Sequence, residues 1–234
     1  MTAAPPPWTF AEFDPVGVDL DSATAVAAYD TNQGTRAAAD DELLDRLAIG
    51  ADSVIVDLGT GTGSLPVQAA KRGAEAHGVD VSTTMLEFAR NRAQQAGVEI
   101  HIHHGGFLSH QHQGPPADVV TTRSALHQLP DTWKQIALVR LHDMLRPGGV
   151  LYLWDAMWSC APAETPDCLA DWIDTMARTD GTGFTREDFE THVREEFSTY
   201  GWILEEMIER AGFEGVESNY PSRWYGEIIA RRPG

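Results

Sequence analysis

Long hydrophobic runs and basic side chains are both scarce in this sequence. No run of about 18 apolar residues occurs, and the first residues lack a basic region followed by an apolar core, so we expect no membrane span and a cytoplasmic location. The 17 lysines and arginines stand against 35 aspartates and glutamates, which gives a formal net charge of -18. Such a chain repels nucleic acid phosphates, so we expect neither a nucleic acid nor a membrane partner.

Cysteine is scarce as well. Cys160 and Cys168 make neither a metal-binding pattern nor a disulfide framework, and we expect both to stay reduced. With 42% hydrophobic residues, a chain of 234 residues can bury one sizeable core. We therefore predict a tail of residues 1–20 and a single domain of residues 21–234. The aromatic residues of the tail indicate that it folds back over the domain.

A glycine-rich turn is the most informative feature. The apolar run Val54 to Leu58 is too short for a helix and rich in β-branched residues, which is typical of a central parallel strand. Gly59, Gly61 and Gly63 follow it, and they remove Cβ atoms from a tight turn. Backbone N–H groups and a helix N-terminus can then approach a ligand closely, so this turn is predicted to bind one.

The spacing of glycines and acids indicates which class of ligand the turn binds. The dinucleotide pattern requires a third glycine where this chain has Ser64. Asp57, two residues before the first glycine, suits an ammonium or sulfonium better than a pyrophosphate. Asp80 ends a second apolar strand, where a carboxylate can accept hydrogen bonds from both ribose hydroxyls. These features favour a cationic nucleoside over a phosphorylated one.

These residues resemble a known family. The run from Asp57 to Gly63 is similar to the first motif of the class I S-adenosylmethionine-dependent methyltransferases, and Asp80 to their ribose-binding acid. Three later stretches, 117–120, 126–131 and 145–149, resemble the ubiquinone/menaquinone methyltransferase-like branch, which methylates mostly small molecules. The resemblance implies S-adenosylmethionine as the cofactor, S-adenosylhomocysteine as the product, and a small-molecule acceptor. It says nothing of the oligomeric state.

The resemblance also assigns site residues. His127 is the candidate for contact with the acceptor, either as a base that takes a proton from it or as a packing residue. Tyr29 matches an aromatic residue of the N-terminal lid, which could cover the sulfonium or merely pack. The predicted cofactor-binding residues are Tyr29, Asp57, Gly59, Thr60, Gly61, Gly63, Asp80, Val81, Met85, Gly106, Phe107 and Arg123.

Two of these positions depart from the family. Many relatives carry an acid that contacts the adenine amino group where this chain has Gly106, so backbone groups and Phe107 are left to hold the base. Arg123 is unusual beside a cationic cofactor. It could bind the methionine carboxylate or an acidic acceptor, or offer only its backbone carbonyl.

Five of the nine histidines fall within twelve residues, which raises the question of a metal. Two of them, His101 and His103, share a strand face, whereas the others fall in a loop rich in glycine, glutamine and proline. No established ligand spacing occurs. We expect a solvated edge strand and loop, and no metal.

The alternation of strand and helix patterns predicts an α/β fold. We expect a Rossmann-like, doubly wound sheet of seven strands, mostly parallel with the last one antiparallel, and a helical insertion at residues 157–198 after the fifth strand. Ser82 and Thr185 are predicted N-caps, and Gly97 a helix end. The predicted strands are 54–58, one ending at residue 80, 98–103, 118–122, 149–155, 215–220 and 224–230. The predicted helices include 22–29, 35–47, 64–71, 131–145, 165–178 and 186–196.

Two other functions stay open at this point. An NAD-dependent oxidoreductase is disfavoured by the glycine spacing. A methyltransferase-like protein that keeps the cofactor for another role is compatible with the departures at Gly106 and Arg123.

Overall fold

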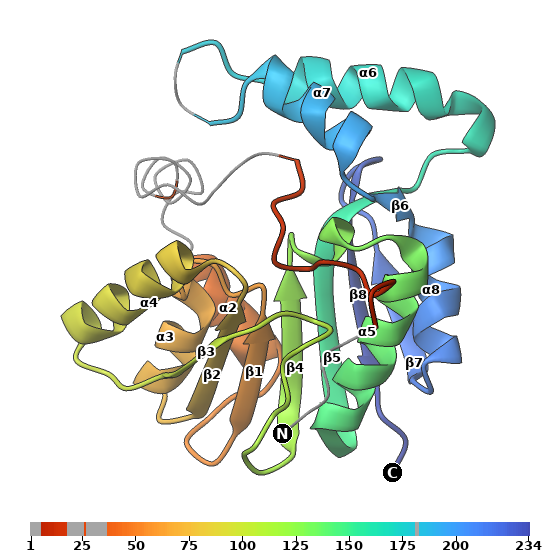
Figure 1. The fold of residues 1–234 in the computed structure, drawn as a ribbon. Coiled ribbons are helices and arrows are strands. Elements are labelled where there is room, and N and C mark those ends of the chain that lie inside the picture. Colours follow the sequence, from red (N-terminus) through yellow and green to blue (C-terminus); the bar gives the residue numbers. More distant parts are fainter. Residues whose placement is uncertain (1–5, 18–25, 27–36, 181–182) are drawn as a thin grey trace.

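The computed structural model describes residues 6–17, 26, 37–180 and 183–234. An eight-stranded sheet forms its centre, in the order β3-β2-β1-β4-β5-β8-β7, with the short β6 paired to β5 beside this path (Figure 1). Among the described strands, β8 alone runs in the direction opposite to all the others, and it pairs antiparallel with β5 and β7. The strands are β1 (Val54–Leu58), β2 (Glu75–Asp80), β3 (His101–His104), β4 (Ala117–Arg123), β5 (Leu145–Trp158), β6 (Thr199–Tyr200), β7 (Glu214–Asn219) and β8 (Tyr225–Arg231). This order and these directions confirm the predicted fold class.

Helices cover both faces of the sheet (Figure 1). All five residues of β1 are buried, and their alternation sends Val54, Val56 and Leu58 to one face and Ile55 to the other. The helices are α2 (Ala37–Arg46), α3 (Ser64–Lys71), α4 (Thr83–Ala96), α5 (Asp131–Met144), α6 (Thr165–Met176), α7 (Arg186–Glu195) and α8 (Gly201–Arg210). Ile55 packs with residues of α2 and α3. Val54, Val56 and Leu58, on the other face, pack with residues of α5 and α8. Of the predicted helix at 22–29, only Val26 is among the described residues, and it is helical and buried.

The predicted helix boundaries follow from local capping. The Ser82 side chain accepts a hydrogen bond from Met85 N at 3.2 Å at the start of α4, and Gly97 ends that helix in the left-handed region at φ 67°. Thr185 and Asp188 form a capping box at the start of α7. All three predicted caps are confirmed.

The insertion after β5 forms a hydrophobic cluster of its own. Helices α6 and α7 lie beyond the carboxyl ends of the central strands (Figure 1), around the buried Trp158, Trp172 and Phe189. Cys160 and Cys168 are free and buried in the same cluster. Strand β5 extends further than predicted, to Trp158, because β8 pairs with its middle and β6 with its last two residues.

The described part of the N-terminal tail, residues 6–17, crosses the molecule between the sheet and the insertion (Figure 1). Phe10 packs against Trp133 of α5 and against Phe197, with ring centroids 6.4 and 6.3 Å apart. The tail therefore folds back over the body, as its aromatic residues predicted. Among the helices of the described residues, none has the length and apolarity that a membrane span requires.

Candidate functional site

A cavity of about 660 Å³ opens at the carboxyl ends of β1, β2 and β4. The glycine-rich turn and the start of α4 form one wall, and tail residues such as Phe10 and Phe13 form another. Ligands of doubly wound sheets bind at this edge, where the strand order reverses. Predicted site residues that line the cavity are Gly59, Gly61, Asp80, Val81, Met85, Gly106, Phe107 and Arg123.

The three glycines of the turn differ in what they permit. All three have positive φ values, at 70° for Gly59, 54° for Gly61 and 75° for Gly63. A Cβ at Gly59 would lie 2.3 Å from the Ala125 Cβ, and one at Gly63 would lie 2.7 Å from the Ala89 Cβ. A Cβ at Gly61 would meet only a sulfur at 3.9 Å. Gly59 and Gly63 therefore allow close packing inside the protein, whereas Gly61 leaves room toward the cavity.

The two acids of the predicted motif have separate positions. Asp80 lines the cavity, and its carboxylate accepts hydrogen bonds from Gly61 N at 2.8 Å and Ser82 N at 2.9 Å. Asp57 is buried beneath the turn and accepts from Thr60 Oγ1 at 2.8 Å and Thr121 Oγ1 at 2.6 Å. Asp80 can thus contact a ligand directly, whereas Asp57 and Thr60 hold the turn in shape.

Burial affects the charge of both acids. It raises the pKa of Asp80, and the N–H groups of Ser82 and Gly61 oppose that rise. It also raises the pKa of Asp57, against the positive charge of Arg123 and the two threonine hydroxyls. The hydrogen-bond donors around each carboxylate therefore favour its charged form.

Arg123 lines the cavity but is already paired. Its Nη1 donates to Asp40 Oδ1 at 2.6 Å, and Ser64 Oγ donates to Asp40 Oδ2 at 2.5 Å. Asp40, on α2, has no exposed surface. Ser124, the first residue after β4, adopts the left-handed region at φ 52°, a conformation that favours glycine and is often found at functional sites. No local pattern of the sequence pointed to Asp40 or Ser124 as site residues.

A carboxylate from the tail lies where the sequence had none. Glu12 Oε2 accepts a hydrogen bond from Leu108 N at 2.8 Å, and a Cβ at Gly106 would be 2.5 Å from that oxygen. The tail thus places an acid beside Gly106, where the resemblance to the family implied that a carboxylate was missing. Phe107 is buried next to it, and Arg140 Nε donates to the Phe107 carbonyl at 2.9 Å.

His127, the predicted contact for the acceptor, lies between two carboxylates. Its Nδ1 bonds to Asp155 Oδ1, and its Nε2 lies 3.0 Å from Glu196 Oε2. Burial alone would lower the pKa of His127, but the two carboxylates outweigh it and raise the pKa to about 10. The ring is therefore an imidazolium at neutral pH, and both nitrogens are engaged. The described residues that line the cavity do not include it.

A proton-accepting role for His127 does not agree with this geometry. A base needs a free nitrogen that faces the substrate, and neither ring nitrogen is free. The remaining predicted residue, Tyr29, lies outside the described residues.

Comparison with known proteins gives three findings. Residues 55–149 match the family model of a methyltransferase domain. An uncharacterized methyltransferase of Oceanobacillus iheyensis is 29% identical over 150 residues, which are 64% of this chain and 66% of that protein. A ubiquinone biosynthesis O-methyltransferase of Ruegeria pomeroyi is 32% identical over 96 residues, 41% of this chain and 38% of that protein. The chain thus spans less than two thirds of the length of either relative.

Solved structures share the fold. A phosphoethanolamine N-methyltransferase of Haemonchus contortus, crystallised with S-adenosylhomocysteine, superimposes with a TM-score of 0.67 at 15% identity, over 91% of this chain and 58% of that one. A methyltransferase of Aquifex aeolicus gives 0.63 at 14% identity, over 90% and 98% of the two chains. At these identities the likeness concerns the fold alone.

Proposed function

We propose that this chain, a class I S-adenosylmethionine-dependent methyltransferase, transfers the methyl group of its cofactor to a small-molecule acceptor. The match of residues 55–149 confirms the family that the first motif and Asp80 predicted. It also argues against the NAD-dependent oxidoreductase. One observation supports the proposal most. Gly61, which has free space where a Cβ would be, and the carboxylate of Asp80 line the same cavity.

The cavity wall fits the parts of S-adenosylmethionine. Asp80 can accept hydrogen bonds from the ribose hydroxyls, because each carboxylate oxygen keeps a lone pair beyond its backbone donor. Glu12 can accept one from the adenine amino group. Arg123 offers a positive charge to the methionine carboxylate, although Asp40 partly neutralises it. A Cβ at Gly61 would point into this space.

The bound cofactor supplies a methyl group that is already activated by its sulfonium. The protein has to align the acceptor with that group and exclude water. Phe10 and Phe13 of the tail cover the cavity from one side. Ser124 and Gln128 present polar side chains to it and can orient the acceptor.

A small acceptor suits this chain better than a macromolecule. The cofactor site is a cavity under a covering segment, and the net charge of -18 opposes nucleic acids. The branch that the sequence resembles acts mostly on small molecules.

Calorimetric titration of the full chain with S-adenosylhomocysteine tests the cofactor, with NADH as the control. We expect micromolar binding of the first and none of the second. Incubation with S-adenosylmethionine and a panel of phenols, amines and carboxylates then tests transfer, with acceptor-dependent release of S-adenosylhomocysteine as the expected result. Tight binding without such release on any acceptor would favour the non-methylating role instead.

A further inference from the structure

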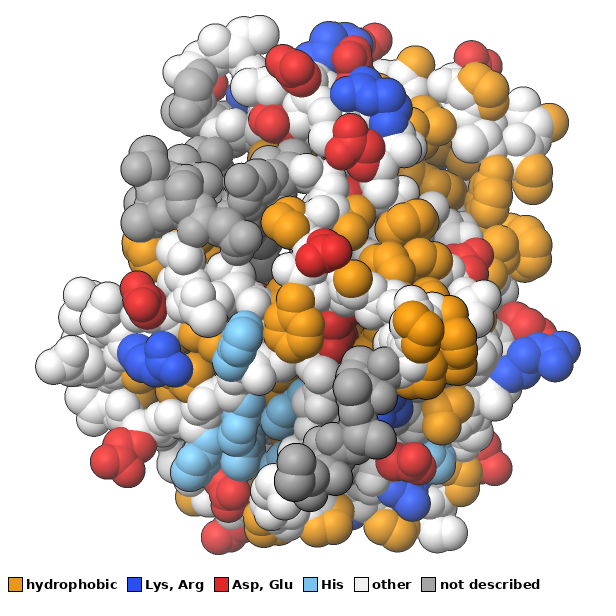
Figure 2. Space-filling model, viewed as in Figure 1, with side chains coloured by type: hydrophobic (Ala, Val, Ile, Leu, Met, Phe, Trp, Pro, Cys, Tyr) orange, Lys and Arg blue, Asp and Glu red, His pale blue; other side chains and the backbone are white. Residues whose placement is uncertain are grey.

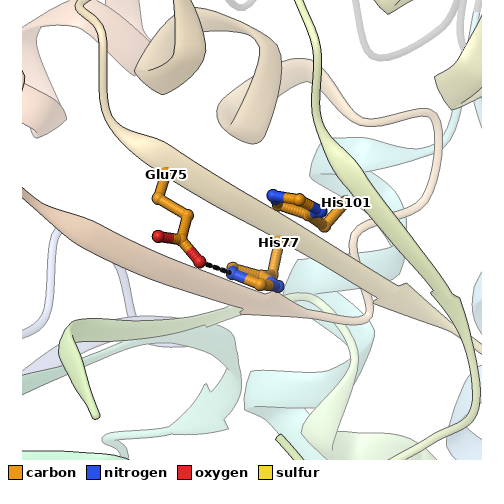
Figure 3. A group of neighbouring side chains, drawn as sticks. All are labelled: Glu75, His77 and His101. Carbon is orange, nitrogen blue, oxygen red and sulfur yellow. Dashed lines mark hydrogen bonds and ion pairs between the residues drawn. The ribbon is translucent and has the colours of Figure 1, made fainter. Parts of the chain in front are cut away.

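A second group of chemically active side chains lies apart from the cofactor cavity. Figure 2 shows histidine side chains gathered on the face that carries β2 and β3, and Figure 3 shows three members of the group. None of its members is among the described residues that line the cavity. We call the group the histidine cluster: Glu75, His77, His101, His103, His110 and His112.

Strand register explains why these residues meet. Parallel pairing sets His77 beside His101 and Val79 beside His103. Glu75 and His77 are two residues apart on β2, so their side chains share a face, and the same holds for His101 and His103 on β3. The side chains of the two strands therefore converge on one face.

The loop after β3 completes the cluster. Arg140 of α5 donates from Nη2 to the His110 carbonyl at 2.6 Å and so holds this loop against the body. The His110 ring lies 5.0 Å from His103, and the His112 ring 4.8 Å from His77, between centroids. The expected solvated loop is thus wrong for His110, which is only 7% exposed.

Three members have the spacing of metal ligands. His77 Nε2 lies 3.0 Å from Glu75 Oε1, and one ligand atom from each of Glu75, His77 and His101 lies within 4.8 Å of the other two. Ligand atoms at about 2.0–2.2 Å from zinc in a tetrahedron are about 3.3–3.6 Å apart. His101 is exposed, so its side chain can rotate to close the remaining distance (Figure 3).

Two buried ring nitrogens provide an independent observation. His110 Nε2 and His112 Nδ1 are buried and have no hydrogen-bond partner within the described ranges. Buried polar atoms are nearly always paired, so two unpaired nitrogens in one cluster point to a missing partner.

We propose that the histidine cluster binds one divalent transition-metal ion of the zinc type, with Glu75, His77 and His101 as ligands and His112 next to them. Imidazole with a single carboxylate suits zinc, nickel or copper better than magnesium or calcium, which require several oxygen ligands. The ion would join β2 to β3 at the edge of the sheet. The proposal is independent of the methyltransferase reaction.

A calorimetric titration of the full chain with Zn²⁺, after a chelator has removed bound metal, tests the site. We expect one ion per chain with micromolar or tighter affinity and a higher melting temperature with the ion. His101→Ala and Glu75→Gln alter partly exposed side chains, so both variants should fold, and each should weaken binding at least tenfold. His142→Gln, on α5 outside the cluster, is the matched control and should bind as the unchanged chain does.

Co²⁺ gives a second readout, because its visible absorption reports the ligand geometry. We expect a spectrum of low-symmetry, nitrogen-containing coordination that His101→Ala removes. The proposal is overturned if the unchanged chain binds no Zn²⁺, or if Glu75→Gln and His101→Ala bind it as tightly as the His142→Gln control. Either result would mean that the histidine cluster only packs the edge of the sheet.

Discussion

The substitution Glu12→Gln examines how the tail contributes to the cofactor site. Glu12 Oε2 accepts from Leu108 N, which leaves the other carboxylate oxygen for the adenine amino group. A glutamine can keep the first bond through its amide oxygen. Its NH₂ group then faces the adenine amino group, so a donor meets a donor and the charge is lost.

The expected effect follows from the strength of such bonds. A hydrogen bond to a charged group contributes about 1.5–3 kcal/mol, which corresponds to about 10- to 150-fold in affinity. Glu12 is only partly buried, so solvent screening favours the lower end. We therefore expect Glu12→Gln to weaken S-adenosylhomocysteine binding about tenfold.

Calorimetry with two ligands isolates this contact. S-inosylhomocysteine has an oxygen in place of the amino group, so the unchanged chain should bind it more weakly than S-adenosylhomocysteine. In Glu12→Gln the difference in affinity between the two ligands should be smaller. Glu87→Gln, on the exposed side of α4, makes the same change in net charge and should bind both ligands normally. Unaltered affinity in Glu12→Gln would refute the reasoning, and tighter binding would mean that the carboxylate occupies the place of the adenine.

Three further predictions concern the turn, the ribose and the insertion. Gly59→Ala should lower the free energy of unfolding by about 2–4 kcal/mol in a denaturant titration, because its Cβ overlaps a neighbour at positive φ, whereas Gly61→Ala should mainly lose cofactor affinity. Asp80→Asn should raise the KM for S-adenosylmethionine with little change in kcat; an unchanged KM would contradict the ribose contact. The fold raises the pKa of His127 from 6.5 to about 10, so protonation of this ring stabilises the folded state. The stabilisation is fully present below pH 6.5 and is lost as the pH rises through 10. Melting temperatures should fall over that range, and less so in His127→Gln.

The first half of the site was predictable because its signals are local. A strand with four apolar residues around Asp57, then glycines at alternate positions, defines β1 and its turn without reference to the rest of the chain. The same is true of the caps at Ser82, Gly97 and Thr185, where one side chain or one glycine determines the helix end. Short-range chemistry is readable from a single sequence.

Contacts between distant segments were not predictable in the same way. Glu12 is 96 residues from Leu108, and no local pattern links the two. The histidines of β3 and of the following loop looked separate, because only the register of β2 with β3 and the bond from Arg140 bring them together. Three-dimensional proximity decides both cases, and it depends on the completed fold.

His127 illustrates how one residue can match a family pattern and serve a different purpose. Asp155 of β5 and Glu196, just after α7, hold its ring from opposite sides, and Phe197 N donates to the His127 carbonyl at 2.8 Å. Burial would raise the pKa of Glu196, but the two histidines that bond to it, His127 and His192, lower it to about 2. His127 and Glu196 therefore both stay charged across the neutral range.

This cluster fixes the insertion to the sheet at a definite place. Lys134 of α5 donates to the Phe197 carbonyl and to Asp131, and the Phe197 ring packs against Phe10 of the tail. Residue 197 thus joins the insertion, the sheet and the segment that covers the cavity. We therefore expect the buried ion pairs of His127 to hold the insertion and the covering segment in place around the cavity. If so, activity should fall at alkaline pH as the pKa of His127, about 10, is passed. In His127→Gln this alkaline loss should be absent from the pH profile.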